Sequence, residues 1–265
     1  MSVDGETPAV NRAGDGRAWT VGRAGMLYRD LLGPGPGGRF IASQIHIREG
    51  GPTADWVHYH RVRFQLVYCT RGWVRVVYED QGPPFVMHAG DCVLQPPEIR
   101  HRVLESAPGS EVVEVAGPAD YETRADEELD LPTGRELPER DFGGQRFVRH
   151  VAAEAVWTPG PRDGFEARDL GVAAGTGGVA AARVLRPRGE AAGDLWSHAG
   201  ELLFRFVLRG SARLARREGA PPDLGPADAL VVPPGLDHAL TECSANFEVL
   251  EVAVPAREGH SPRRS

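Results

Sequence analysis

Short runs of apolar and β-branched residues recur along the chain, and glycine- and proline-rich turns separate them. Clear examples are Met26–Leu31, Phe40–Ile47 and Trp73–Glu79. Runs of this length and composition, flanked by turn-forming residues, predict β-strands. The 33 Gly and 22 Pro, with only 7% aromatic residues, also fit many short strands better than long helices. We therefore expect a mostly β protein.

The strand pattern occurs twice. Shifting the sequence by about 138 residues aligns the segment ARVLRPRG with QIHIREGG and places His198 on His60. With one residue lost, the same shift places His238 on His101. Such self-similarity indicates one fold present in two copies.

A charged, proline-punctuated segment at 118–145 separates the two copies, which is typical of a linker or a surface-wrapping segment. The length of 265 residues allows two ordinary domains, predicted at 17–117 and 146–255. Residues 1–16 and 256–265 lack apolar periodicity, so we expect them to be disordered.

Candidate metal ligands cluster in the first copy. Side chains alternate between the two faces of a strand, so His58 and His60 point the same way. Gln65 opens the next apolar run, and His101 follows a short strand that Pro96 and Pro97 interrupt. Three imidazoles and an amide oxygen suit a divalent transition metal better than calcium or magnesium. We interpret His58, His60, Gln65 and His101 as a metal site.

These residues resemble the two motifs of the cupin superfamily, which are a glycine, H-x-H, glutamate and glycine, and then a glycine, Pro-x-Gly and histidine. The matching residues are Gly51, His58, His60, Gln65 and Gly72 in the first motif, and Gly90, Pro96 and His101 in the second. Gln65 replaces the usual glutamate, and Glu98 replaces the glycine of Pro-x-Gly. With the internal repeat, the resemblance implies a bicupin, all-β, with two tandem jelly-roll β-barrel domains.

The second copy keeps the motif glycine but loses ligands, because Trp196 stands in the place of His58 and Leu203 in that of Gln65. A site of His198, His238 and the nearby Glu201 is an alternative. We expect instead that this copy has lost its metal and serves packing, dimerisation or a second ligand pocket. Its Arg205 would then pair with Glu201 or bind a substrate anion.

The neutral ligand set leaves the full double charge on the ion and makes it a strong Lewis acid. The resemblance to bicupins with one metal site implies an Fe(II) dioxygenase acting on a small oxygenated aromatic or dicarbonyl molecule, with Zn, Ni or Mn as alternative ions. Gln65 also suits a non-redox isomerase, cyclase or lyase. A third reading is a small-molecule binding module. Flanking charges provide candidate catalytic groups: Glu98 for acid–base chemistry, and Arg61 or Arg63 for binding an anion.

The net charge of −7 and the pI near 5.7 argue against nucleic acid as a partner. No apolar run reaches the length of a membrane helix, and the N-terminus does not resemble a signal peptide, so we expect a cytoplasmic protein without a membrane partner. Three widely spaced cysteines do not support a disulfide framework. The family resemblance implies a homodimer with a small-molecule substrate.

Overall fold

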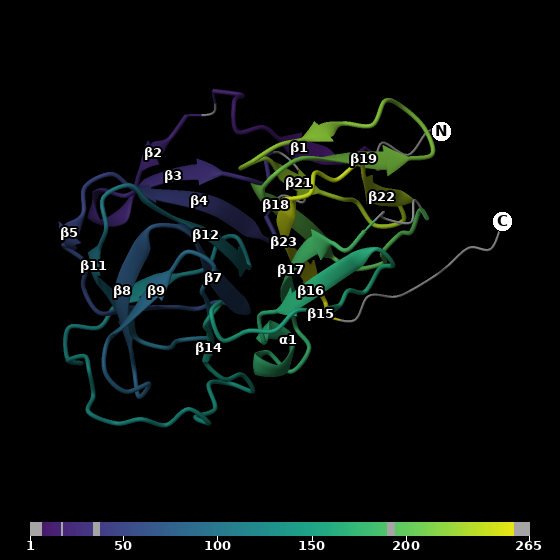
Figure 1. Cartoon of the computed structure of the whole chain (residues 1–265). Coiled ribbons are helices and arrows are strands. Elements are labelled where there is room, and N and C mark those ends of the chain that lie inside the picture. Colours follow the sequence, from purple (N-terminus) through teal and green to yellow (C-terminus); the bar gives the residue numbers. More distant parts are fainter. Residues whose placement is uncertain (1–6, 17, 34–37, 190–193, 257–265) are drawn as a thin grey trace.

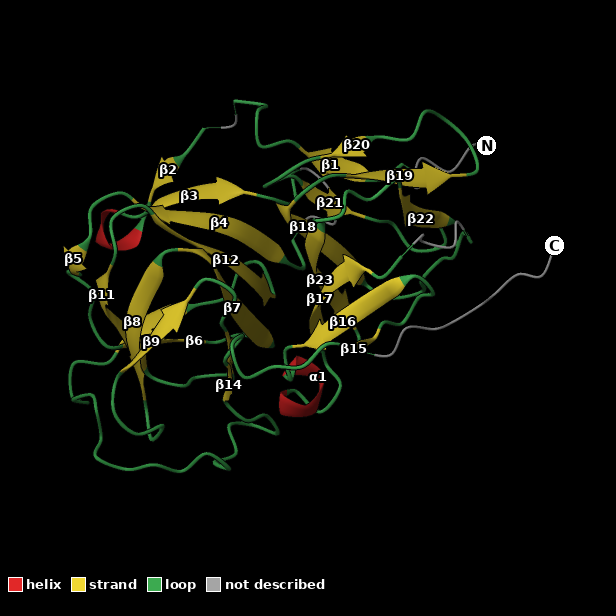
Figure 2. Ribbon diagram, in the orientation of Figure 1, coloured by secondary structure: helices red, strands yellow, loops and turns green. Residues whose placement is uncertain are grey.

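The computed structural model describes residues 7–16, 18–33, 38–189 and 194–256 (Figure 1). Nearly all of its regular structure is β, as the sequence predicts (Figure 2). Its helices within these ranges are a short 3-10 turn, η1 (Arg23–Gly25), and a single turn, α1 (Val172–Gly175). No helix among the described residues is long and apolar enough to cross a membrane.

Two antiparallel sheets, which we call the first β unit, take up most of the first half of the chain. A seven-stranded sheet has the order β14-β10-β7-β12-β4-β3-β2, and a six-stranded sheet has the order β13-β6-β11-β8-β9 with β5 beside β11. The strands are β2 (Thr20–Val21), β3 (Leu27–Asp30), β4 (Ile41–Ile47), β5 (Gly51–Pro52), β6 (His58–His60), β7 (Phe64–Arg71), β8 (Trp73–Tyr78), β9 (Phe85–His88), β10 (Cys92–Gln95), β11 (His101–Ser106), β12 (Ser110–Gly117), β13 (Thr123–Ala125) and β14 (Val148–His150).

Two further sheets form what we call the second β unit, and its seven-stranded sheet has the same order of equivalent strands as that of the first unit. Its seven-stranded sheet runs β1-β21-β18-β23-β17-β16-β15, and a three-stranded sheet runs β20-β19-β22. The sheets of both units are open rather than closed into barrels, which corrects the expectation of β-barrels. The strands are β1 (Ala9–Asn11), β15 (Thr158–Pro159), β16 (Phe165–Asp169), β17 (Ala181–Pro187), β18 (Leu202–Arg209), β19 (Ala212–Arg216), β20 (Asp223–Leu224), β21 (Ala229–Val231), β22 (His238–Thr241) and β23 (Glu248–Val254).

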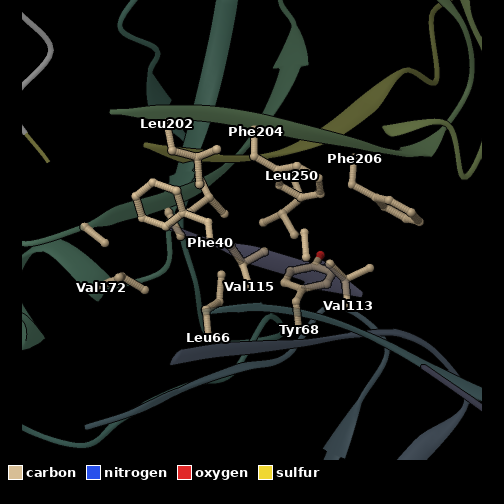
Figure 3. Close-up of a cluster of buried hydrophobic side chains, with 14 of the residues drawn as sticks. Phe40, Leu66, Tyr68, Val113, Val115, Val172, Leu202, Phe204, Phe206 and Leu250 are labelled. Atoms are coloured by element: carbon tan, nitrogen blue, oxygen red, sulfur yellow. The ribbon is translucent and has the colours of Figure 1, made fainter. Parts of the chain in front are cut away.

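The two seven-stranded sheets pack against each other through one apolar cluster (Figure 3). Leu66 and Tyr68 of β7 and Val113 of β12 face Phe204 of β18 and Leu250 of β23 across this layer. Burying such side chains stabilises the packing by about 1.5–3 kcal/mol each. Because faces alternate along a strand, the same β7 turns its other face toward the interior of the first unit. That other face carries Gln65 and Val67.

Segments at the predicted boundaries are parts of the sheets. The prediction of disorder is wrong for residues 9–11, because β1 pairs with β21 and Asn11 is buried. An open sheet edge gains hydrogen bonds from an added strand, which explains this pairing. Residues 1–6 and 257–265 lie outside the described residues.

The predicted linker at 118–145 is also part of the first unit. Its strand β13 pairs with β6, and Phe142 is buried in the apolar cluster of the first unit. Just beyond it, β14 pairs with β10 as an edge strand of that unit's larger sheet. The segment therefore wraps the first unit rather than only connecting two domains.

Candidate metal centre

Three histidines converge inside the first β unit. His58 and His60 lie on the same face of β6, and His101 begins β11, whose backbone pairs His101 with His58. The ring centroids are 4.2 Å apart for His58 and His101, and 5.0 Å apart for His58 and His60. One ring nitrogen from each lies within 4.8 Å of the others. Among the described residues, no other group of three His, Cys, Asp or Glu side chains is this close.

Each imidazole is oriented through its Nδ1 atom. His58 Nδ1 donates to the carbonyl of Trp56 (2.8 Å), and His101 Nδ1 donates to that of Ile99 (3.0 Å). His60 Nδ1 is hydrogen-bonded to the Thr123 hydroxyl (2.8 Å). This pattern leaves the Nε2 lone pairs for a metal, and such outer hydrogen bonds are the usual support of metal-binding histidines. His58 Nε2 is buried and has no hydrogen-bond partner.

The environment keeps these histidines neutral. Burial lowers the pKa of His58 to about 4, with a further lowering from Arg23. Burial, His58 and Arg23 lower the pKa of His60 to about 3, and burial and the other two histidines lower that of His101 well below its usual value. A neutral imidazole is the form that binds a metal ion, so no proton has to leave at pH 7.

Gln65 presents an amide oxygen to the same interior. Its Nε2 donates to Glu114 Oε1 (2.6 Å), and since a carboxylate only accepts, this bond fixes the orientation of the amide. Gln65 Oε1 is buried without a partner. An unpaired buried oxygen is costly unless a ligand or ion completes it, so Gln65 fits the predicted set of four ligands.

A cavity of about 380 Å³ adjoins the histidines. Most of its wall surface is apolar, with Met26, Ile45 and Val67 among the lining residues. Tyr121 donates its hydroxyl proton to Glu114 Oε1 (2.8 Å). The polar or aromatic residues of the lining are Arg23, Tyr28, Trp56, His60, Gln65, Tyr78, Gln95, His101, Glu114, Tyr121 and Thr123.

The predicted catalytic residues lie outside this cavity lining. Arg61 and Glu98 are about half exposed and pair with each other (3.1 Å). Arg63 is also exposed and pairs with Glu201 of the second unit (3.2 Å). Glu98 has a φ of 61°, which explains why glycine is common at this place, because left-handed backbone strains other residues. A catalytic role for Glu98, Arg61 and Arg63 stays a prediction, and their positions speak against contact with a molecule in the cavity.

Several residues that line the cavity were not identified as site residues from the sequence. Arg23 of η1 lies 3.5 Å from Asp55, which is buried beside His58. Asp55 comes from the irregular segment between β5 and β6, and neither segment has the alternation of a strand. Tyr121 and Thr123 come from the segment predicted to be a linker. Of these residues, only Glu114 could have been found from the sequence, because its carboxylate interrupts the apolar run VVEVA.

At the equivalent place in the second unit, the described residues do not bring together three potential metal ligands. His198 Nε2 donates to the carbonyl of Val232 (2.9 Å), and its Nδ1 accepts from the Gly200 N–H (3.2 Å), so both ring nitrogens are used. Glu201 pairs with Arg63 instead of approaching the histidines. The predicted pairing of Arg205 with Glu201 is wrong, because Arg205 binds Glu251 (2.6 Å).

Comparison with known proteins agrees with this fold. Residues 44–116 match the family model described as the cupin domain. No curated protein matches the sequence.

Similar solved structures include oxalate decarboxylases. That of Lactobacillus farciminis, in complex with formate, is 13% identical with a TM-score of 0.67, covering 95% of this chain and 87% of that one. That of Bacillus subtilis at pH 4.6 is 13% identical with a TM-score of 0.67, covering 98% and 79%. A second structure of the Bacillus subtilis enzyme, described with Mn(II) centres, has the same identity and TM-score and covers 98% and 80%. At these identities the likeness shows the fold alone.

Proposed function

We propose that this protein is a metal-dependent bicupin enzyme, a non-haem iron dioxygenase that acts on a small oxygenated aromatic or dicarbonyl molecule. One observation carries the proposal: three buried histidines converge beside a mostly apolar cavity, and the Nε2 atom of His58 is buried without a hydrogen-bond partner. In this proposal the second β unit is a degenerate second cupin domain, and the chain forms a homodimer.

His58, His60, His101 and Gln65 would hold the ion. Three imidazole nitrogens and one amide oxygen suit Fe(II), and also Zn, Ni or Mn. The bound ion would supply Lewis acidity toward an anionic oxygen of the substrate, and redox chemistry if it is iron. The neutral ligands leave its charge uncancelled, which favours an anionic substrate.

The cavity indicates the shape of that substrate. About 380 Å³ lies near the lower end of ligand pockets, so the substrate is small. The apolar walls pack against a ring or an alkyl group and exclude water. Arg23 is the cation among the described lining residues, and we assign it the role of attracting the anionic group, which the sequence analysis gave to Arg61 or Arg63.

A specific observation favours a second candidate, a non-redox isomerase, cyclase or lyase. Glu114 accepts hydrogen bonds from both Gln65 and Tyr121 inside the cavity. Burial and the nearby Glu114 raise the pKa of Tyr121, so Tyr121 keeps its proton and can donate it in a hydrogen bond. In this candidate Glu114 takes the acid–base role predicted for Glu98, because Glu114 lines the cavity.

Metal analysis and oxygen uptake separate these functions. Protein purified without added metal and under nitrogen is analysed by mass spectrometry, then loaded with Fe(II) and tested on phenols and diketones in an oxygen electrode. We expect about one ion per chain and oxygen consumption with at least one compound. His60→Ala should lose both, while the matched second-unit variant His198→Ala should keep both.

Other outcomes decide against dioxygenation. Turnover without oxygen, with zinc, nickel or manganese as effective as iron, would establish the non-redox function. In that case Glu114→Gln should lower kcat by about 100-fold or more, the size of a lost general acid or base. Protein that neither contains nor takes up metal would leave only a binding module.

A further inference from the structure

The cavity of the first β unit has two ends of different chemistry. Several of its polar lining groups lie against the histidines. The Tyr121 ring is 5.1 Å from that of His60, measured between centroids. Tyr78 stacks on His101, with centroids 5.5 Å apart, and its hydroxyl accepts a hydrogen bond from Gln95 (2.9 Å). These groups form a polar end around the proposed metal centre.

The other end of the cavity is lined by one apolar cluster, which we call the apolar chamber. It consists of Ile45, Val74, Val76, Met87 and Val112, all of them buried. These residues come from β4, β8, β9 and β12, so both sheets contribute. A polar group of a ligand would find no hydrogen-bond partner among such side chains, whereas a hydrocarbon group gains from leaving water.

The strand register shows in which direction the apolar chamber extends. On β8, Tyr78 pairs with His101, and Val76 and Val74 follow at alternate positions of the same strand. At about 3.3 Å per residue, Val74 lies about 13 Å along the strand from Tyr78. Met87 on β9 pairs with Val74. The chamber therefore extends along the strands, away from the histidines.

The larger sheet changes from polar to apolar in the same direction. Gln65 pairs with Gln95, and Gln95 donates to Tyr78, so the polar ends of the two sheets meet. On β12, Glu114 lies nearer to this end and Val112 lies farther from it, as their pairing with β7 shows. A molecule in the cavity therefore has polar partners at one end and apolar contacts at the other.

The remaining polar residues of the lining also lie toward the polar end. Arg23 is 3.5 Å from Asp55, which in turn is 3.8 Å from His58 Nδ1. Burial raises the pKa of Tyr28, Arg23 lowers it and Glu114 raises it, so the Tyr28 hydroxyl lies near these charged groups. The described lining residues therefore place no charge in the apolar chamber.

We propose that the cavity selects a small amphipathic molecule, with its oxygen atoms at the histidine end and an apolar group that extends into the chamber between Val74, Met87 and Val112. A carboxylate or hydroxyl at the far end of such a molecule would be buried without a partner, so dicarboxylates and polyhydroxylated acids are rejected. The proposal rests on the proposed metal-dependent function for the polar end only. The chamber itself does not depend on a metal.

Calorimetric titration of the full-length protein loaded with Zn(II), an ion without redox chemistry, tests the selection. The probes are hydroxamates, which chelate metal ions through two oxygens. Hexanohydroxamate has four more methylene groups than acetohydroxamate, and we expect it to bind about 100-fold more tightly, because each buried methylene contributes about fourfold. Adipic acid monohydroxamate has the length of hexanohydroxamate but ends in a carboxylate, and it should bind no more tightly than acetohydroxamate.

Methyl NMR of methionine-labelled protein and two variants locate the apolar group. Hexanohydroxamate, but not acetohydroxamate, should shift the Met87 methyl resonance. Val74→Phe fills the chamber and should weaken hexanohydroxamate about tenfold or more without weakening acetohydroxamate, which a disrupted fold would not do. Met87→Ala enlarges the chamber and should shift the preference toward octanohydroxamate. Val156→Phe, at an exposed apolar position before the second unit, is the control and should change nothing.

Equal affinities for acetohydroxamate and hexanohydroxamate, or for hexanohydroxamate and its carboxylate-ended analogue, would overturn the proposal. A protein that selects the longer probe but consumes no oxygen when loaded with iron would contradict only the dioxygenase function. A protein that takes up no Zn(II) would contradict the metal site, and 1-hexanol then tests the chamber in the metal-free protein. It should shift the Met87 resonance in the unmodified protein and not in Val74→Phe, and no shift in either would overturn the proposal.

Discussion

The two β units have the same local backbone arrangement but carry side chains of different chemistry at equivalent places. In the first, the backbone pairs His58 with His101, and the ring centroids are 4.2 Å apart. In the second, the equivalent pair is Trp196 and His238, and the centroids are 4.3 Å apart. Since the geometry is shared, the residues placed on it decide whether a unit can bind a metal.

A glutamate that occupies the equivalent place in both units shows this most clearly. Glu114 on β12 accepts from two neutral groups, the Gln65 amide and the Tyr121 hydroxyl. Its equivalent on β23, Glu251, is paired with the cations Arg205 and Arg183. The first unit thus gathers neutral donors around a place for a cation, whereas the second carries its own cation.

Removing a histidine should affect the two units very differently. We expect His60→Ala to lower metal affinity by more than about 100-fold, since losing a ligand exceeds the 10–100-fold effect of losing its support. His198→Ala should leave the affinity unchanged, because both His198 nitrogens bond to the backbone. Competition with a chelator measures the affinities. Equal losses would contradict the assignment to the first unit.

Neutralising the buried glutamate should cost more stability in the second unit. Glu251→Gln leaves Arg205 without its charged partner and should lower the free energy of unfolding by about 3 kcal/mol or more. Glu114→Gln changes contacts with neutral groups and should cost about 1 kcal/mol. Urea unfolding of the metal-free proteins provides the comparison, and a larger loss for Glu114→Gln would refute it.

Glu251 should also make the stability of the protein depend on pH under acidic conditions. Burial would raise the pKa of Glu251, but Arg205 and Arg183 outweigh it and lower the pKa to about 2, from 4.5. The folded state therefore binds this proton less readily, and the stability is present above pH 4.5 and lost as the pH falls toward 2. Glu251→Gln should lose less stability than the unmodified protein over that range. Parallel curves would show that Glu251 is not the group responsible.

A hydroxyl from the wrapping segment should tune the metal site. Thr123→Val removes the hydrogen-bond partner of His60 Nδ1 and should weaken metal binding about 10–100-fold, less than loss of the ligand itself. Thr158→Val in the second unit, which alters only a hydroxyl contact with Ala167, serves as the control. Unchanged affinity would mean that His60 is held in place without Thr123.

The smallest expected effect comes from the two equivalent turns. Glu98 adopts a φ of 61° where the second unit has Gly235 at 80°. Glu98→Gly should therefore stabilise the protein by about 1 kcal/mol, and Gly235→Ala should destabilise it by a similar amount, because open space surrounds Gly235 and only backbone strain remains. Thermal unfolding measures both, and a loss of stability in Glu98→Gly would show that the ion pair with Arg61 matters more.

Much of the first unit could be predicted from local sequence. Alternation along β6 places His58 and His60 on one face, and the apolar run of β7 places Gln65 and Val67 on another. The internal repeat predicted the matching strand order of the second unit. The choice of Glu98, Arg61 and Arg63 as catalytic residues came from their nearness in sequence to the ligands, and nearness along the chain does not decide which side chains enter a cavity.

The sequence by itself determined the all-β class, the repeat and the three histidines, because these depend on period-two alternation and on short-range spacing. Only the tertiary structure decided that Thr123 and Tyr121 complete the first site, that β1 pairs with the second unit, and that Glu251 holds Arg205. These are contacts between segments far apart in the chain. They form because open sheet edges, buried charges and buried hydrogen-bonding groups require partners. The local sequence pattern does not show which distant residue will be that partner.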